Sequence, residues 1–446
     1  IDACLVGSEM CIRDSYTTGC KQEDGDKIKY LYHAGTNGID YTTKVFSLES
    51  ANLDDLRYSN FFSDVVTSVG VGEKDYEKIQ KEQSLSTGGI GLSFNVLPDS
   101  SGNKFLLSAG LHGSALKKNF SKLESLMKNT IHGFRLDEIK RLEELTQFEI
   151  AGKEKSITQS GHILAMNGAS AQISKFGAVS EFVGGVSSIH NLKTLRDSNG
   201  KIKMEMLLES FSKLKSFINP ASKIEVVISA SNQNFDKETT SKTGLETLDV
   251  LNGIDLQSEE IAWITGSDVN FCAQAFPTVG YDHPDAPILT VLGAVLRNGF
   301  LHSAIREKGG AYGSGAQQDS ASRSFRFFSY RDPNCNETFN AFNESIEWSL
   351  KSINSEKLEE GILGVISSID KPGSPAGEAR ADFNQNIRGI DQSKRKIFRS
   401  RVINCSVERL VEVSNKYLTG EPKRSVISGK HFEKEIKDLG LSIHNV

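Results

Sequence analysis

An internal repeat is the feature that most constrains how this 446-residue chain can fold. Apolar positions that open comparable segments in the two halves lie about 220 residues apart in every case. Self-similarity at a fixed offset indicates two copies of one structural unit. The chain is therefore predicted to form two related domains. The matched pairs are Phe105 with Phe325, Phe120 with Phe339, and Leu136 with Leu358.

Each predicted copy opens with a strand followed by a helix. In the first copy, residues 44–49 alternate in polarity like a strand, and residues 52–69 have helical spacing. In the second copy, residues 269–275 alternate in the same way, and an apolar stripe over 288–296 predicts a helix. Gly299 is a residue type that often ends helices, so we expect this helix to end there.

A hairpin and two helices follow in the first copy. Residues 88–96 and 104–110 read as strands, and the segment between them, 98–102, is rich in turn-forming residues. Residues 117–129 and 136–145 then place leucine, isoleucine and phenylalanine three or four apart, as amphipathic helices do.

The second copy repeats this plan after a glycine-rich turn. Residues 324–330 predict a strand, and helices are predicted around Phe339 and Leu358. Consecutive strands that give way to helices favour a mainly antiparallel sheet with helices packed on one face. The predicted fold class is therefore α+β, with two homologous domains. A doubly wound α/β sheet is the alternative.

The composition suggests where each domain begins and ends. We assign residues 1–29 to a non-native or linker segment, 30–235 to the first α+β domain, the polar stretch 236–260 to a linker, and 261–446 to the second α+β domain. The first fifteen residues, IDACLVGSEMCIRDS, resemble translated adapter sequence. We therefore expect the natural protein to begin further upstream and this chain to be a piece of it.

Charge and cysteine usage exclude several classes of partner. The 52 basic residues are outnumbered by 57 acidic ones, so no strongly cationic surface is expected and nucleic acid is an unsuitable partner. The six cysteines include no C-x-x-C pair, which indicates reduced thiols in an intracellular protein of the cytoplasm or mitochondrial matrix. Apolar stretches such as residues 224–230 have only the length of a strand, so no membrane partner is predicted.

Local motifs give no complete active site. The nine histidines include no pair spaced three to five residues apart, so neither H-E-x-x-H nor H-x-x-E-H is present. The G-x-S-x-G elbow, the P-loop and the dinucleotide-binding fingerprint are also absent. We therefore predict no metal ligands and no cofactor-binding residues in this chain.

The glycine-rich segment 306–315, REKGGAYGSG, is the best candidate site. Its glycines permit a sharp bend, and Arg306 and Tyr312 supply a guanidinium and a phenol that can hold a carbonyl or a carboxylate. The plain alternative is a turn between helix and strand with Tyr312 half buried. His112, His283 and His302 are expected to be ordinary solvated or capped side chains, and the aromatic residues of 325–330 are expected to be mainly core.

Residues 306–315 resemble the Arg/Tyr element in the C-terminal half of pitrilysin- and insulinase-type zinc peptidases. The sequence FRFFSYRDP at 325–333 resembles the presequence-protease branch, and residues 36–39 and 86–90 agree with it. The resemblance implies a clam-like enzyme in which an N-terminal half carries the inverted zinc motif. It also implies that Arg306 and Tyr312 reach the substrate beside the scissile bond, as catalytic residues.

This resemblance implies a function that depends on a second half. Zinc would be bound by the N-terminal half of the same protein, so this chain alone is expected to be an inactive part of a metalloendopeptidase. The implied substrates are short unfolded peptides such as cleaved targeting sequences. Family members hold substrate as an added strand, and residues 88–94 and 316–325 are the places where such an edge could lie. A non-catalytic peptide-binding or core subunit of the same fold is the open alternative.

Overall fold

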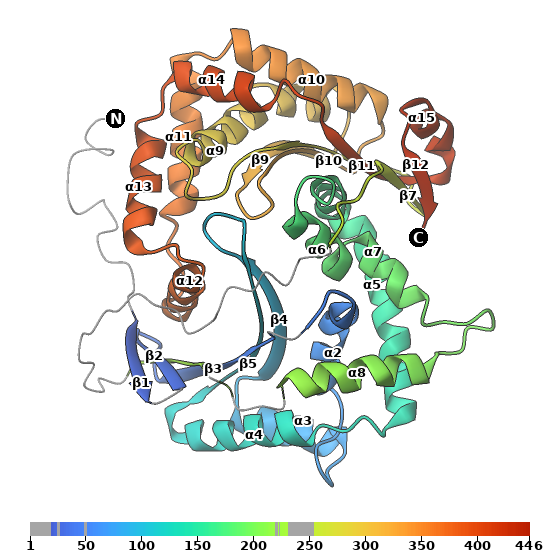
Figure 1. Ribbon diagram of the computed structural model, residues 1–446, viewed down its shortest axis with the longest axis vertical. Coiled ribbons are helices and arrows are strands. Elements are labelled where there is room, and N and C mark those ends of the chain that lie inside the picture. The colour runs from blue at the N-terminus through green and yellow to red at the C-terminus, as the bar shows by residue number, and fades with distance from the viewer. Residues whose placement is uncertain (1–18, 25–26, 49–50, 219–221, 223, 231–253) are drawn as a thin grey trace.

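The computed structural model describes residues 19–24, 27–48, 51–218, 222, 224–230 and 254–446. Within these residues the chain forms two six-stranded sheets with helices packed against them (Figure 1). The predicted α+β class is confirmed. In this view the second sheet lies above the first, and the β4–β5 hairpin of the first sheet extends toward the second domain.

The first sheet has the strand order β1-β2-β6-β3-β5-β4. All neighbouring strands are antiparallel except β2 and β6, which run parallel. The predicted hairpin is β4 and β5, and β4 lies at the edge of the sheet. The strands are β1 Cys20–Asp24, β2 Lys27–His33, β3 Ile39–Ser47, β4 Ile90–Pro98, β5 Phe105–Leu116 and β6 Ile224–Ser229.

The second sheet has the order β12-β7-β11-β8-β10-β9, which confirms the repeat. The five strands from β7 to β11 occupy the same sheet positions, in the same chain order, as β2 to β6, and β7 and β11 form the matching parallel pair. The outermost strands differ, since β1 is antiparallel to β2 whereas β12 is parallel to β7. The strands are β7 Ile261–Thr265, β8 Phe271–Pro277, β9 Gly313–Asp319, β10 Ser324–Tyr330, β11 Lys423–Gly429 and β12 Ser442–Asn445.

The helix predicted over 52–69 is divided in two. The main-chain N–H of Asn52 donates to the Asp55 carboxylate, and that of Asp55 donates to the Asn52 side chain, so a closed turn forms first. Tyr58 then has a non-helical backbone before the second helix. The helices of the first domain are η1 Asp54–Leu56, α2 Ser59–Val66, α3 Tyr76–Ser86, η2 Lys117–Asn119, α4 Phe120–Gly133, α5 Ile139–Ser170, α6 Lys175–Gly184, α7 Val186–Lys193 and α8 Met204–Ile218.

The helix end predicted at Gly299 is wrong. The helix continues through Gly299 as a π-helix, η3, and ends at Lys308. A Cβ atom on Gly299 would lie 2.5 Å from the Trp348 ring, so glycine here allows close packing of two helices. The helices of the second domain are α9 Ala286–Leu296, η3 Arg297–Lys308, α10 Asn336–Lys351, α11 Ser355–Ile369, α12 Pro375–Ile387, α13 Gln392–Ile403, α14 Val407–Tyr417, η4 Lys430–Phe432 and α15 Glu433–Asp438.

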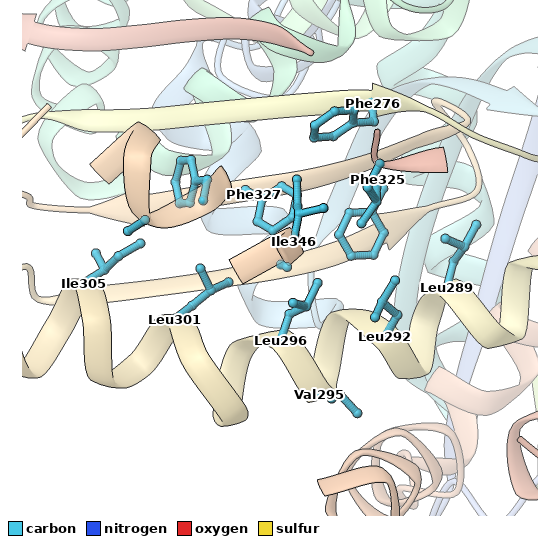
Figure 2. Close-up of a cluster of buried hydrophobic side chains, with 14 of the residues drawn as sticks. Phe276, Leu289, Leu292, Val295, Leu296, Leu301, Ile305, Phe325, Phe327 and Ile346 are labelled. Atoms are coloured by element: carbon cyan, nitrogen blue, oxygen red, sulfur yellow. The ribbon is translucent and has the colours of Figure 1, made fainter. Parts of the chain in front are cut away.

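The expectation that apolar stretches have only strand length is also wrong. Together α9 and η3 form a helical run, Ala286–Lys308, that is long and apolar enough to cross a membrane by length and composition alone. Half of its most apolar window is buried inside the protein. Figure 2 shows its leucines directed toward the strands that carry Phe325 and Phe327, so the run packs as a helix of the second core.

The long helix α5 joins the two domains. Its first part packs in the core of the first domain through Leu142 and Ile150. The helix changes direction at Ser160, where the backbone is non-helical, and its second part then packs on the second sheet. There Leu164 belongs to one apolar cluster with Phe271 of β8. One helix of the first domain thus covers a face of the other domain's sheet.

Helix α12 does the reverse. It belongs to the second domain, yet its residues Ala379 and Phe383 share a buried cluster with Tyr30 and Val45 of the first sheet. The ring of Tyr30 meets that of Phe383 edge-on at 5.1 Å. Each sheet therefore has helices of its own domain on one face and a helix from the other domain on the opposite face.

The structure also bears on the predicted segment limits. The first sheet extends back to Cys20, ahead of the limit at residue 30, because β1 and β2 pair continuously from Cys20 to Leu31. Of the predicted linker, residues 236–253 lie outside the described residues, and residues 254–260 have no helix or strand. Residues 1–15 also lie outside the described residues.

Candidate functional site

Arg306 and Tyr312 lie at the two ends of a tight bend between η3 and β9. The N–H of Gly310 donates to the carbonyl of Arg306 at 3.1 Å, and the N–H of Ala311 donates to that of Ile305 at 3.1 Å. Gly310 has φ +81°, a backbone conformation that side chains other than glycine rarely adopt. The glycine therefore closes the bend and brings the two predicted residues to one end of the edge strand.

Tyr312 is fixed through its backbone and its ring. Its N–H lies 3.1 Å from the carbonyl oxygen of Tyr330 and 3.3 Å from that of Arg331. The two tyrosine rings meet edge-on, with centroids 5.6 Å apart. The residue is 68% exposed, and its hydroxyl has no hydrogen-bond partner among the described residues. The alternative of a half-buried ring is therefore wrong, because the phenol is held at its base and its hydroxyl is available.

Arg306 lies on the last turn of η3 and is exposed. Its Nη1 is 3.2 Å from Nε2 of His302, one turn earlier, and Nδ1 of that histidine is 3.5 Å from a carboxylate oxygen of Glu307. In the part of the chain that the structure describes, no carboxylate forms an ion pair with Arg306. The guanidinium thus contacts a ring nitrogen through one Nη atom and retains its other donors for an external acceptor.

The aromatic strand β10 shows which side of the sheet the bend lies on. Phe325 and Phe327 are buried in the core under α9, as predicted. Phe328 and Tyr330 are only partly buried and lie on the other face, packed against α5. Because Tyr312 packs on Tyr330, it lies on the α5 side of the sheet.

His162 of α5 completes this aromatic contact. Its ring centroid is 4.8 Å from that of Tyr330 and 5.5 Å from that of Phe328. Its Nδ1 is buried without a hydrogen-bond partner, and burial lowers the pKa of the imidazole. The imidazole contacts both rings, and it supports Tyr330 and, through it, Tyr312. Nothing local in the sequence connects α5 with the second sheet, so no sequence signal pointed to His162.

The edge strands clarify the two ranges in which an added strand was expected. Strand β4 is the edge of the first sheet, so most of residues 88–94 lie on an edge. Strand β9 is the edge of the second sheet, but β10 is interior. The range 316–325 therefore contains an edge only as far as Asp319. This edge begins one residue after Tyr312.

Comparisons with known proteins identify what the chain is similar to. Residues 12–195 match the family model of the associated region of peptidase family M16, subfamily C, and residues 267–425 match the "PreP C-terminal domain". The chain is similar to the mitochondrial presequence protease of Drosophila melanogaster, with 28% identity over 84% of this chain and 37% of that protein. The corresponding protein of Yarrowia lipolytica is 27% identical over 88% of this chain and 40% of its own length. The chain is homologous to the C-terminal region of presequence proteases.

The chain matches only part of each of these relatives, and that part is their C-terminal region. It spans about two fifths of the length of the curated relatives that it matches. Solved structures share the fold. A protease from Helicobacter pylori aligns over 93% of this chain and 100% of its own, with a TM-score of 0.63 and 13% identity. The peptidase M16 inactive domain from Pseudomonas fluorescens aligns over 92% of this chain and 98% of its own, with a TM-score of 0.61 and 15% identity.

The residues that the structure describes do not form a zinc site. Among the residues that the structure describes, no three histidine, cysteine, aspartate or glutamate side chains come together as metal ligands. Cys272, Cys335 and Cys405 are buried free thiols, and burial raises the pKa of Cys272 and Cys405. We therefore derive no metal-dependent step from these residues.

A hollow lies between the first sheet and α12 of the second domain. It has a volume of 240 Å³ and is lined from β3, β4, β5, β6 and α12, with Arg380 at its rim and His112 in its wall. Burial lowers the pKa of His112, whose Nδ1 is 3.4 Å from the carbonyl of Gly110. His112 was expected to be an ordinary side chain, and the hollow was not predicted. The polar residues at alternate positions of β4, Ser93 and Asn95, were the available signal.

Proposed function

We propose that this chain is the C-terminal, substrate-binding half of a zinc metalloendopeptidase that degrades short unfolded peptides of the presequence kind. The observation that supports this most directly is the bend at the end of η3. There an exposed guanidinium and a phenol without a hydrogen-bond partner among the described residues are held at the start of an edge strand. A purely structural turn has no need of two available donors.

The two side chains have distinct proposed roles. The hydroxyl of neutral Tyr312 donates a hydrogen bond to the carbonyl oxygen of the scissile bond, and this bond strengthens as negative charge develops there. Arg306 donates from its planar fork to a neighbouring main-chain carbonyl or to the developing charge. Zinc, held by the N-terminal half, would polarise the same carbonyl and activate water.

Strand β9 gives these donors a substrate-binding partner. An extended peptide that adds to a sheet edge forms main-chain hydrogen bonds that do not depend on its sequence. Because β9 begins directly after Tyr312, a peptide bound along this edge runs past the phenol. This arrangement suits unfolded substrates, since a folded protein has no free strand to offer.

Reconstitution with the N-terminal half tests the proposal. The chain and a zinc-loaded N-terminal half from the same protein are purified separately, then mixed and assayed with a fluorogenic unfolded peptide. We expect neither part to hydrolyse the peptide and the mixture to do so. One equivalent of zinc on this chain with turnover by the chain alone would contradict the proposal. A mixture that binds peptide without hydrolysing it would favour the non-catalytic peptide-binding subunit.

A further inference from the structure

The geometry of the hollow between the first sheet and α12 points to a second peptide site: we propose that it binds the C-terminal carboxylate of a peptide together with an apolar last side chain. The inference rests on the proposed function for its ligand class, since peptides are the substrates proposed there. It concerns residues that lie in a different part of the molecule from Arg306 and Tyr312.

The charge of the hollow favours an anion. Arg380 is the one residue with a formal charge among those that line it, and no aspartate or glutamate is among them. Its guanidinium carbon lies 4.8 Å from the centre of the Tyr41 ring, which holds the side chain at the rim by a cation–π contact. In the described part of the chain Arg380 makes no ion pair. An arginine held in place without a carboxylate is a suitable partner for an anionic ligand.

Neutral donors surround the same opening. Asn384 is exposed at the rim one helical turn after Arg380, so the two side chains lie on the same face of α12. On the sheet side, the amide nitrogen of Asn95 is 3.4 Å from the hydroxyl of Ser93, and both residues line the hollow. The Ser93 hydroxyl itself donates to the carbonyl of Gly110 at 3.5 Å. A carboxylate bound beside Arg380 would therefore meet the side-chain amides of Asn384 and Asn95 as additional donors.

The other wall of the hollow is apolar. Phe383 and Ile387 of α12 face Val45 and Leu97 of the sheet. Inorganic phosphate has no apolar group to pack against this wall. The last residue of a peptide carries both a carboxylate and a side chain on its Cα atom, so it can contact the arginine and the apolar wall together. The volume of 240 Å³ lies below the range of about 300–1,000 Å³ for sites that enclose whole ligands. The hollow therefore suits a chain end, with the remainder of the peptide outside.

Binding of matched peptides to this chain tests the proposal. Fluorescein-labelled ten-residue peptides of one unfolded sequence end in leucine with a free carboxylate, in leucine amide, or in glycine with a free carboxylate. We expect the leucine acid to bind about 10- to 100-fold more tightly than the amide, as loss of charge-assisted hydrogen bonds predicts. The glycine acid should bind more weakly than the leucine acid, because it leaves the apolar wall uncovered.

Two arginine variants locate the site. Arg380→Gln removes the charged partner of the carboxylate, so the ratio of acid affinity to amide affinity should fall to about one. Because Arg380 is exposed and outside the cores, the variant should fold, and circular dichroism verifies this. Arg401→Gln on α13, also exposed, should leave the ratio unchanged. Equal binding of acid and amide, or an unchanged ratio in Arg380→Gln, would overturn the proposal. Displacement of the leucine acid by an equal concentration of inorganic phosphate would also overturn it, in favour of a free anion.

The reconstitution assay separates this inference from the proposed function. An active mixture with an acid-to-amide ratio of one would refute only the carboxylate site. A clear ratio that Arg380→Gln abolishes, combined with an inactive mixture, would refute only the peptidase assignment.

Discussion

The two domains differ most informatively in the turn that leads into the edge strand. In the first domain this turn joins α3 to β4, and the Thr87 hydroxyl both donates to the carbonyl of Gln83 at 2.8 Å and lies 3.2 Å from the N–H of Gly89. The Thr87 side chain is therefore satisfied within the turn. In the second domain the matching turn leaves the donors of Arg306 and Tyr312 directed outward. Two copies of one scaffold thus differ in whether the polar side chains of the turn bond within it or are directed outward.

The helices that precede these two turns also differ, in their type of winding. Helix α3 is an ordinary α-helix that begins with a side-chain cap from Asp75 to the N–H of Lys78. The corresponding η3 is a π-helix over its whole length, Arg297–Lys308. Segments of π-helix are rare and are found frequently at functional sites. The wider winding places Arg306 on the last turn, directly before the bend.

Removal of the Tyr312 hydroxyl should have the largest effect of any change that tests the contrast between the two turns. In the reconstituted enzyme, Tyr312→Phe should lower kcat by roughly 10- to 1000-fold, the range for loss of one donor to a developing oxyanion. The ring contact with Tyr330 is retained, so the unfolding temperature of the chain should not change. Steady-state kinetics with a fluorogenic peptide measures the effect.

The matching turn of the first domain supplies the control. Thr87→Val removes a hydroxyl that bonds only within its own turn among the described residues, so kcat should change less than about twofold. Equal losses in the two variants would show that the turns do not differ in function. An unchanged rate in Tyr312→Phe would remove Tyr312 from the proposed mechanism.

The contact of α5 with the second sheet allows a sharp test of how the domains are joined. A Cβ on Gly161 would lie 2.5 Å from two ring atoms of Phe271, one of them at the root of the ring, where the side chain cannot swing away. Gly161→Ala should therefore destabilise the chain by about 3 kcal/mol. Thermal and urea unfolding measure the change.

A second glycine on the same helix controls for backbone effects. A Cβ on Gly152 meets nothing within 4 Å, so Gly152→Ala should stabilise the chain by roughly 0.5–1 kcal/mol through helix propensity alone. Equal effects of the two substitutions would mean that α5 does not pack tightly on the second sheet.

Two buried carboxyl groups, one in each domain, differ in whether a positive charge lies beside them. Glu181 of α6 accepts hydrogen bonds from the N–H and hydroxyl of Ser187, but its Oε2 has no partner, and burial raises its pKa to about 7. Asp382 of α12 is buried beside Arg395, whose Nη2 lies 2.6 Å away, and it accepts a hydrogen bond from Tyr32. One carboxyl lacks a countercharge and the other has one.

This difference predicts opposite responses to neutralisation. The folded-state pKa of Glu181 is raised, so its contribution to stability is fully present below about pH 4.5 and is lost as the pH rises through 7. Between pH 5 and pH 8, the unsubstituted chain should therefore lose unfolding free energy that Glu181→Gln does not lose. The difference between the two proteins in this pH-dependent loss should be on the order of 2 kcal/mol. Urea unfolding of both proteins at the two pH values measures it.

Asp382→Asn should change the free energy of unfolding in the opposite direction. It removes the carboxylate beside Arg395 and should destabilise the chain at both pH values. A Glu181→Gln variant with the pH dependence of the unsubstituted chain would show that Glu181 is ionised in the folded protein and that the two carboxyl groups do not differ.

The sequence predicted local elements best where the pattern was short and periodic. The strand expected over 324–330 is β10 to the residue, and the hairpin of β4 and β5 was located by its turn residues. It failed where a residue type has two uses. Glycine both ends helices and permits close contacts, and at Gly299 the contact with Trp348, distant in sequence, decided between them.

The sequence by itself determined the duplication and the α+β class, because periodic apolar positions are local properties. It singled out Arg306 and Tyr312 through a glycine-rich bend together with a family resemblance, and their role stays a prediction. Only the tertiary structure decided that α5 and α12 are exchanged between the sheets and that His162 supports the tyrosines. It alone formed the hollow beside Arg380. These features join residues that are far apart along the chain, and an apolar pattern records that a face is buried without recording which partner buries it.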